Sequence, residues 1–332
     1  MEALLSALLS VKNLSIGIRK NFPSGENKLF SAVKDISFDI YGGEIVGLAG
    51  ESGSGKSLTA FSIPGLLDEN KEVTGGSILF NGSRDLLTLS DRELQSIRGK
   101  EISMIFQEPF SSLNPLVKIG DQIAETLILH GEKEKGQNKK QIMALMEKLK
   151  LSDPEKLMES YPHRLSGGMC QRVMIALAII CRPRLLIADE PTTALDQSTQ
   201  IQILNLMKEI NRDLGTSIIF ISHDLGLIRD LCSRLLVMYS GRILEEGYTE
   251  EIFNNPAHEY TRGLLRSIPG RAQKGKDLAV IPGRIHSLEE GRPPGCPFHP
   301  RCEKAKAECK KEFPPARAVS PTHTTHCILR EE

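Results

Sequence analysis

Gly50-Glu51-Ser52-Gly53-Ser54-Gly55-Lys56-Ser57 carries the strongest structural signal in the chain. It matches the pattern G-x-x-x-x-G-K-[ST] and stands between an apolar run at residues 44–49 and a predicted helix at residues 57–67. Glycines let such a loop curl until several backbone N–H groups point at one phosphate beside a helix N-terminus. Lys56 is expected to reach the β- and γ-phosphates, and the Ser57 hydroxyl to ligate Mg²⁺. A glycine turn with a surface lysine is the competing interpretation, and the position between strand and helix argues against it. The predicted nucleotide contacts are Gly50, Ser52, Gly53, Ser54, Gly55, Lys56, Ser57 and Leu58.

A second apolar run, Leu185-Leu186-Ile187-Ala188, ends in the two carboxylates Asp189 and Glu190. Ligands of parallel α/β sheets bind at the carboxyl ends of the strands, so a buried strand with this ending places the acids at the nucleotide. Asp189 is expected to hold the Mg²⁺ shell, and Glu190 to act as the general base toward water. A strand can also end in acids because the chain leaves for solvent. The phosphate loop upstream favours the catalytic interpretation.

Two more polar residues follow predicted strands. Gln107 comes after an apolar run that begins at Ile102, and its amide could touch Mg²⁺ or the attacking water. His223 follows the apolar residues 218–221, and an imidazole there could hydrogen-bond the γ-phosphate and hold Glu190 and water in line. A lone glutamine is usually a surface residue, and a lone histidine at a strand end is more often structural. Both predictions therefore rest on the position of these residues directly after predicted strands.

The segment Leu165-Ser166-Gly167-Gly168-Met169-Cys170-Gln171-Arg172 lies between the phosphate loop and the acidic strand. Bare glycine amides at the start of a helix form an anion site. The plain alternative is an ordinary helix N-cap, and the two roles are compatible. The sequence therefore predicts a second phosphate-binding element.

Composition limits the possible partners. The chain has 332 residues with 42 Lys+Arg and 42 Asp+Glu, so no net field favours nucleic acid or anionic lipid. No stretch approaches the roughly 18–20 consecutive apolar residues that a membrane-spanning helix needs. We expect a soluble protein without a nucleic-acid partner, whose membrane role would come from other chains.

Together these motifs resemble the ATP-binding cassette (ABC) ATPases over about residues 10–247. In family terms the resemblance assigns Walker A to Gly50–Ser57, the Q-loop to Gln107, the signature to residues 165–171, the end of Walker B to Asp189 and Glu190, the D-loop to Ala194-Leu195-Asp196, and the switch histidine to His223. The implied fold is an α/β P-loop NTPase cassette, with a RecA-like core, an antiparallel β subdomain and a helical insertion at about residues 108–165.

The resemblance also implies that two cassettes pack head to tail. Ser166, Gly167 and Gly168 of one subunit then cap the γ-phosphate of ATP held by the other, and Asp196 belongs to the nucleotide site. Two positions depart from the family pattern, because the usual Gln after Ser-Gly-Gly is Met169 here and the next, usually basic, position is Cys170. Cassettes usually stack adenine on an aromatic side chain upstream of Walker A. Phe22 is the first candidate and Phe30 the second, and either could equally be a loop or core anchor.

The flanking residues resemble one branch, the oligopeptide/dipeptide/nickel importer ATPases of bacteria and archaea. This resemblance rests on residues 106–115, on Tyr161-Pro162-His163 before the signature, and on residues 293–302. It implies a domain at 1–247 and a C-terminal extension at 248–332, which begins with helical patterning over residues 249–267. The implied function is ATP hydrolysis that powers peptide import, with nickel or another small solute as the alternative cargo. A non-transport cassette ATPase and a P-loop kinase fit less of the sequence.

The branch also implies partners and a location. These are a second ABC ATPase subunit, identical or paralogous, two transmembrane permeases and an extracytoplasmic solute-binding protein. The chain is then expected at the cytoplasmic face of the membrane as a peripheral subunit. The helical insertion around Gln107 to Pro115 would receive the permeases.

Four cysteines near the C-terminus are spaced C-x5-C-x6-C-x17-C: Cys296, Cys302, Cys309 and Cys327. Zinc knuckles prefer C-x2-C pairs, so this spacing suits zinc poorly. Four thiolates suit a [4Fe–4S] cluster, although ferredoxin spacings differ, and some members of the resembled family carry such a cluster. Nearby histidines leave a Cys/His zinc site open, and unliganded thiols or a disulfide are the remaining alternatives. These histidines are His299, His323 and His326.

Overall fold

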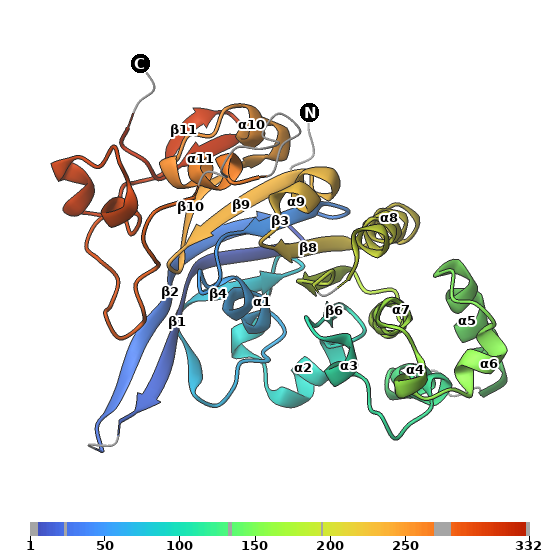
Figure 1. The fold of residues 1–332 in the computed structure, drawn as a ribbon. Helices are drawn as coiled ribbons and strands as arrows, with labels where there is room; N and C mark the ends of the chain where they lie inside the picture. Colours follow the sequence, from blue (N-terminus) through green and yellow to red (C-terminus); the bar gives the residue numbers. More distant parts are fainter. Residues whose placement is uncertain (1–5, 23–24, 132–134, 194, 269–279, 330–332) are drawn as a thin grey trace. The chain divides into compact units, whose positions relative to one another are not determined.

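The computed structural model describes residues 6–22, 25–131, 135–193, 195–268 and 280–329. The chain forms two compact units (Figure 1). The first comprises Met1–Tyr41, Ile45–Thr88 and Ile221–Glu332, and the second comprises Gly42–Glu44 and Leu89–Phe220. The chain therefore leaves the first unit, builds the second, and returns.

An antiparallel sheet with the strand order β2-β1-β4-β5 forms part of the first unit. Its strands are β1 (Leu9–Asn21), β2 (Asn27–Ile40), β4 (Lys71–Phe80) and β5 (Arg84–Asp85). The long strand β1 lies between β2 and β4, antiparallel to both (Figure 1). Leu9, Val11, Leu14 and Ile16 of β1 are buried, and the ladder shifts register around Asn13, whose φ is 49°. This sheet confirms the predicted antiparallel β subdomain.

The other strands of the first unit follow the order β11-β12-β10-β9-β3. They are β3 (Ile45–Ala49), β9 (Arg234–Tyr239), β10 (Arg242–Tyr248), β11 (Arg317–Ser320) and β12 (His323–Thr325). β3 runs parallel to β9 and is buried along its whole length, as expected of an apolar run in a parallel sheet. The helices of this unit are α1 (Lys56–Ser62), α9 (Leu225–Leu231), α10 (Thr249–Asn254) and α11 (Glu259–Arg266), with short 3-10 helices η1 (Leu86–Thr88), η4 (His299–Arg301) and η5 (Ala307–Lys310).

The second unit contains strands in the order β8-β7-β6, with β6 and β7 parallel. These are β6 (Ile102–Ile105), β7 (Leu185–Asp189) and β8 (Ser217–Ser222), the last two residues of β8 belonging to the first unit. Its helices are α2 (Asp91–Ile97), α3 (Pro109–Ser112), α4 (Ile119–Leu129), α5 (Lys135–Lys148), α6 (Pro154–Met158), η2 (Pro162–Arg164), α7 (Gly167–Ile179) and α8 (Gln197–Leu214). The run from α3 to η2 is the predicted helical insertion. Among the described residues, no helix has both the length and the apolar character needed to cross a membrane.

Helix α8 shows how sequence spacing fixes orientation in the second unit. Its buried residues Ile203, Leu206, Met207 and Ile210 recur at intervals of three and four, which places them on one face. The Asp196 side chain caps the first turn, and Gly215 ends the helix with a φ of 67°.

The helical pattern at residues 249–267 forms two helices rather than one. α10 ends at Asn254 and α11 begins at Glu259, with Pro256 between them. Proline cannot donate the helical hydrogen bond, and it drives the preceding residue out of the helical region. The predicted helix at 57–67 is also shorter: α1 ends at Ser62, two residues before Pro64, which has no N–H to continue the helical hydrogen bonds.

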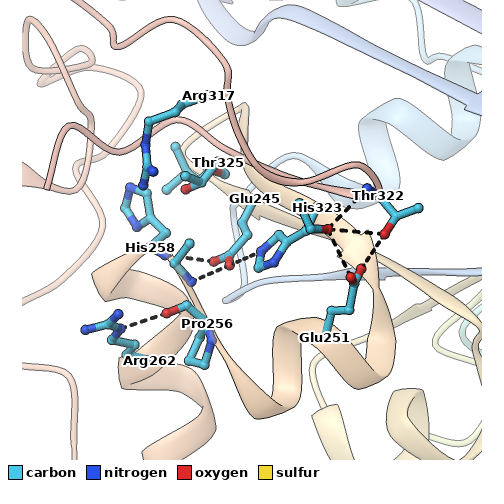
Figure 2. A network of polar contacts seen from close by, with 12 residues as sticks. Glu245, Glu251, Pro256, His258, Arg262, Arg317, Thr322, His323 and Thr325 are labelled. Atoms are coloured by element: carbon cyan, nitrogen blue, oxygen red, sulfur yellow. Dashed lines mark hydrogen bonds and ion pairs between the residues drawn. The ribbon is translucent and has the colours of Figure 1, made fainter. Parts of the chain in front are cut away.

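A buried carboxylate joins the C-terminal residues to β10 (Figure 2). Glu245, which is fully buried, accepts the backbone N–H groups of Ala257 at 2.6 Å and His258 at 3.0 Å. Its Oε1 also lies 2.7 Å from Nε2 of the buried His323. Because β12, which contains His323, pairs with β10, this network fixes both the sheet edge and the entry to α11.

We expect Glu245→Ala to lower the free energy of unfolding by about 3 kcal/mol or more, because the buried donors would lose their shared acceptor. Thermal unfolding of the full chain measures this. The matched control is Glu251→Ala, since the Glu251 carboxylate accepts the exposed or half-buried hydroxyls of Ser320 and Thr322. Equal losses of stability in the two variants would refute the structural role assigned to Glu245.

Candidate functional site

The phosphate loop connects β3 to α1 in the first unit. Gly50 has a φ of 150°, and a Cβ built there would lie 2.1 Å from the carbonyl oxygen of Met238. Only glycine fits at that point. Gly53 and Gly55 adopt φ values of 78° and 104°, a conformation that L side chains rarely accept. The loop therefore has the backbone that the motif requires.

The Lys56 side chain folds back onto the backbone of the phosphate loop. It is buried, and Nζ donates to the carbonyl oxygens of Gly50 at 2.8 Å and Glu51 at 3.0 Å. Ser52, Gly53 and Ser57 are exposed. Ser54 is fully buried beneath the loop, and its carbonyl oxygen accepts the N–H of Gly241 at 2.8 Å. The phosphate loop thus contains both exposed residues and buried residues that hold its backbone in place.

His223 is exposed directly after β8. The next residue, Asp224, caps α9 by accepting the N–H groups of Gly226 at 2.7 Å and Leu227 at 3.4 Å. Because this cap fixes the turn, His223 is held at the carboxyl end of a buried strand, where ligands of α/β sheets bind.

In the second unit, the structure brings Gln107 and Glu190 together. β6 and β7 are parallel, with Ile105 opposite Ala188, so the residues that follow both strands emerge at the same edge. Nε2 of Gln107 donates to Oε2 of Glu190 at 3.2 Å. The sequence predicted a functional role for each residue, and the register explains why they meet.

Glu190 has an unusual backbone and a further partner. Its φ of 46° is left-handed, which is costly for a residue with a side chain and recurs at functional sites. The hydroxyl of Thr193 donates to its carboxylate at 3.0 Å. Thr193 was not identified from the sequence as a partner of Glu190. Its position only three residues after Glu190, in the short loop that follows the acidic strand, was the signal available for it. Asp189 is buried at the end of β7.

The Ser-Gly-Gly segment starts α7. Ser166 is the N-cap, and its hydroxyl accepts the N–H of Met169 at 3.4 Å. Ser166 is exposed, whereas Cys170 is fully buried. A Cβ at Gly168 would lie 3.0 Å from Cγ2 of Thr199, so a larger residue would crowd α8. The plain N-cap reading is therefore correct for Ser166, and its exposed hydroxyl leaves the anion site open as a prediction.

Burial explains one departure from the family pattern. Cys170 stands where a basic residue is usual, and its thiol lies inside the unit with Sγ 3.7 Å from the carbonyl oxygen of Pro162. Burial raises the pKa of Cys170 to about 11, so the thiol stays neutral.

The predicted D-loop is described only in part, because Ala194 lies outside the described residues. Asp196 accepts the Thr199 hydroxyl at 2.6 Å and the Ser198 hydroxyl at 2.5 Å, along with the Thr199 N–H at 3.0 Å. Hydrogen bonds from Ser198 and Thr199 hold the pKa of Asp196 well below its usual range. Asp196 is thus a charged helix cap, and its nucleotide role stays a prediction.

The two adenine-stacking candidates contact each other, with ring centroids 6.2 Å apart. Phe30 is buried in β2, whereas Phe22 is half-buried beyond the end of β1. Phe22 is therefore the more accessible ring, and its stacking role stays a prediction.

The four C-terminal cysteines line one small cavity: Cys296, Cys302, Cys309 and Cys327. His258, His299 and His326 line it too, whereas His323 is bound to Glu245 instead. All seven cysteines of the chain lie in its described part, and all are free thiols. Burial raises the pKa of Cys296 to about 12. Within the described ranges, no three His, Cys, Asp or Glu side chains come together as a site for a metal ion. The geometry thus gathers the cysteines without itself supplying a metal centre.

Two family models match the chain. The model described as "ABC transporter" matches residues 33–193, and that described as "Oligopeptide/dipeptide transporter, C-terminal region" matches residues 244–309. The first covers the phosphate loop, Gln107, the Ser-Gly-Gly segment and the acidic strand. The second covers Cys296, Cys302 and Cys309.

Curated relatives match almost the whole chain. The oligopeptide transport ATP-binding protein OppD of Salmonella typhimurium is 44% identical over 323 residues, which cover 97% of this chain and 94% of that protein. The dipeptide transport ATP-binding protein DppD of Bacillus subtilis is 43% identical over 329 residues, covering 99% of this chain and 96% of that protein.

Solved structures support the same assignment. The ATP-binding cassette MJ0796, in a dimeric post-hydrolysis state bound to ADP and Pi, matches with a TM-score of 0.62 at 29% identity, covering 73% of this chain and 98% of that chain. CbiO1 from Clostridium perfringens, part of the ABC transporter complex cbiONQ, matches with a TM-score of 0.62 at 25% identity, covering 75% of this chain and 92% of that one. The chain belongs to the ATP-binding proteins of ABC transporters, in the oligopeptide/dipeptide transport family.

Proposed function

We propose that this chain is the ATP-hydrolysing subunit of an importer that carries peptides across the cytoplasmic membrane. The observation that carries the proposal is the match to both families in one chain, the ABC model over the nucleotide motifs and the oligopeptide/dipeptide model over the C-terminal region. Relatives named for oligopeptide and dipeptide transport, at 44% and 43% identity, favour peptides over nickel or another small solute. A non-transport ABC ATPase would leave the C-terminal match unexplained.

In this proposal, different residues of the chain bind the nucleotide and the Mg²⁺ ion. The phosphate loop and Lys56 bind the ATP phosphates, and Phe22 stacks on adenine. The oxygen donors of Ser57, Gln107 and Asp189 suit Mg²⁺, which prefers oxygen ligands. Bound Mg²⁺ would offset the negative charge of the phosphates.

Glu190 supplies the proton transfer. Its carboxylate accepts the proton of the attacking water while Gln107 and Thr193 hold it by hydrogen bonds. His223 stabilises the γ-phosphate by a hydrogen bond.

A second ABC ATPase subunit completes the proposed site. Ser166, Gly167 and Gly168 present a helix N-terminus, which favours the γ-phosphate of ATP held by that subunit. Asp196 caps α8, whose Thr199 lies beside Gly168, and we assign it to the same interface. Hydrolysis removes the bridging charge, and the dimer then opens. The partner is either a second copy or a paralogue. The domain boundary at residue 247 also remains a proposal; β10 runs from Arg242 to Tyr248 across it.

The proposed location is the cytoplasmic face of the membrane. Two permeases would dock on the insertion around residues 107–115, where Phe110 and Leu116 expose large apolar side chains, and a solute-binding protein would deliver the cargo. Affinity purification of the tagged full chain from its native membranes tests this. Two permeases and a solute-binding protein are expected to co-purify. Soluble chain purified without any permease would contradict the transport role.

We also propose that Cys296, Cys302, Cys309 and Cys327 hold a [4Fe–4S] cluster. The support is their arrangement around one cavity and the absence of disulfides among these described cysteines. Four thiolates are the ligand set of such a cluster, with one thiolate on each iron. Zn²⁺ is the alternative.

Anaerobically purified full chain is expected to show broad absorbance near ~400 nm, because iron–sulfur thiolate bonds absorb there. Cys309→Ser should lose this absorbance. The matched control Cys181→Ser changes a cysteine outside the cavity and should retain it. Colourless wild-type protein with stoichiometric zinc would refute the cluster assignment.

A further inference from the structure

Two residues of the C-terminal segment, by which we mean the described residues after Tyr248, contact Glu51 of the phosphate loop: Tyr260 and Arg301. Arg301 forms a two-pronged ion pair with the Glu51 carboxylate, with Nη1 2.6 Å from Oε2 and Nη2 3.0 Å from Oε1. The Arg301 side chain is 5% exposed and that of Glu51 is 31% exposed. Paired planar contacts of this kind are stronger and more directional than a single contact. The two residues lie 250 positions apart in the sequence.

Arg301 is itself held rigidly. Its remaining donors bind backbone carbonyls, with Nε 2.8 Å from Pro282 O and Nη2 3.2 Å from Ile281 O. Nη1 also lies 3.3 Å from the Tyr239 hydroxyl. Because the guanidinium is fixed on several sides, it can hold the Glu51 carboxylate in one place.

A second contact holds the backbone of Glu51. Its N–H donates to the Tyr260 hydroxyl at 2.8 Å, and Tyr260 is completely buried. Tyr260 is joined to Glu245 through His258, because His258 Nδ1 accepts the Tyr260 N–H at 3.0 Å and Glu245 accepts the His258 N–H at 3.0 Å. Figure 2 shows Glu245 and His258. Its ring packs edge-on against Tyr239 with centroids 4.6 Å apart.

The third group of Glu51, its carbonyl oxygen, accepts from Lys56 at 3.0 Å. The side chain, N–H and carbonyl of one loop residue are therefore all engaged, two of them by the C-terminal segment and one by the lysine of the motif. A shift of Glu51 would move an acceptor of Lys56. In addition, an unpaired carboxylate in the loop would repel the phosphates of a nucleotide.

We infer that Arg301 and Tyr260 are positioning residues of the ATP site, acting through Glu51. Tyr260 fixes the loop backbone, while Arg301 fixes the carboxylate and neutralises its charge. The C-terminal segment thus controls the affinity of the phosphate loop for ATP. The inference rests on the proposed ATP-hydrolysing function, and none of these residues needs to touch the nucleotide.

The test has two measurements. Equilibrium binding gives the ATP affinity of the full chain, and steady-state kinetics give KM and kcat of ATP hydrolysis by the chain in its complex with the co-purified permeases. Arg301→Gln should weaken ATP binding about tenfold, because it frees a carboxylate beside the phosphates, and raise KM with kcat at saturation little changed. Restoring neutrality with Glu51→Gln in the Arg301→Gln background should recover most of that affinity. Tyr260→Phe, which keeps the ring and removes the acceptor, should weaken binding about threefold.

The matched control is Arg262→Gln. Arg262 lies in α11, where it pairs with Glu259 at 3.1 Å and donates to Pro256 O at 2.8 Å, two partners that lie outside the phosphate loop. It should lose stability without losing ATP affinity. Thermal unfolding of every variant separates folding from binding.

The outcomes are distinct. Wild-type affinity in a folded Arg301→Gln chain would overturn the inference and leave the proposed function standing. A double variant that binds ATP more weakly than Arg301→Gln would also overturn it, because the charge argument predicts recovery. A folded wild-type chain that binds no ATP would overturn the proposed function together with the inference.

Discussion

Glu190→Gln is expected to bind ATP normally and to hydrolyse it about 10²- to 10⁴-fold more slowly than the wild-type chain, the range for losing a general base. The substitution keeps the shape of the side chain and lets it accept a hydrogen bond from Thr193, so the site is preserved. An amide cannot take the proton of the attacking water. ATP should therefore persist and hold the two subunits together, which size-exclusion chromatography with Mg-ATP detects as a stable dimer.

The matched control is Glu209→Gln, which changes a glutamate of α8 whose carboxylate faces Lys150 at 3.6 Å. Surface ion pairs contribute little, so this variant should hydrolyse ATP at the wild-type rate. Undiminished turnover in Glu190→Gln would remove the general-base assignment. A Glu190→Gln dimer that forms equally well without ATP would show that bound ATP does not hold the two subunits together.

Ser166→Arg is expected to abolish cooperative ATP hydrolysis while ATP affinity in the isolated chain stays nearly unchanged. The exposed hydroxyl at the start of α7 is replaced by a long cation, which obstructs the face offered to the γ-phosphate held by the other subunit. Steady-state hydrolysis against ATP concentration measures the cooperativity, and equilibrium binding measures the affinity.

Loss of the helix cap alone would cost only about 1 kcal/mol. Ser90→Arg provides the control, because Ser90 caps α2 with a capping box in the same unit and has no part in the proposed interface. Its hydrolysis should remain cooperative. Normal turnover by Ser166→Arg would refute the capping of ATP across subunits.

The central elements of the fold were predictable from local sequence signals. β3, β7 and β8 are continuous apolar runs, and such runs in an α/β pattern form buried parallel strands. The residues that follow these strands are then located at the edge where ligands bind, so Glu190 and His223 could be identified without a structure. The meeting of Gln107 and Glu190 follows from the parallel register of β6 and β7.

The C-terminal part was less predictable. β11 and β12 are short, and β12 becomes a strand because β10 offers it an edge, which no local pattern in residues 323–325 reveals. Glu51 was recognised only as a variable position of the phosphate loop. Its partners Arg301 and Tyr260 lie far along the chain, and such contacts are set by tertiary packing rather than by local propensity.

The cavity lined by the four cysteines was predictable in part from the sequence. Spacing alone could not show that Cys296 and Cys327 face the same cavity, because the intervening residues follow no regular period. Burial raises the pKa of Cys296 and of Cys327, so these two thiols stay neutral without a bound cation to favour their charged form.

ATP-driven peptide uptake by proteoliposomes, which contain this chain with its co-purified permeases and binding protein, tests most directly whether this chain powers peptide import. With labelled di- to pentapeptides on the binding-protein side and Mg-ATP on the side of this chain, uptake should require ATP and should stop in the Glu190→Gln complex. Uptake that continues without ATP or in the Glu190→Gln complex would show that ATP hydrolysis by this chain does not drive import. So would ATP hydrolysis that no peptide, with its binding protein, stimulates or converts into uptake.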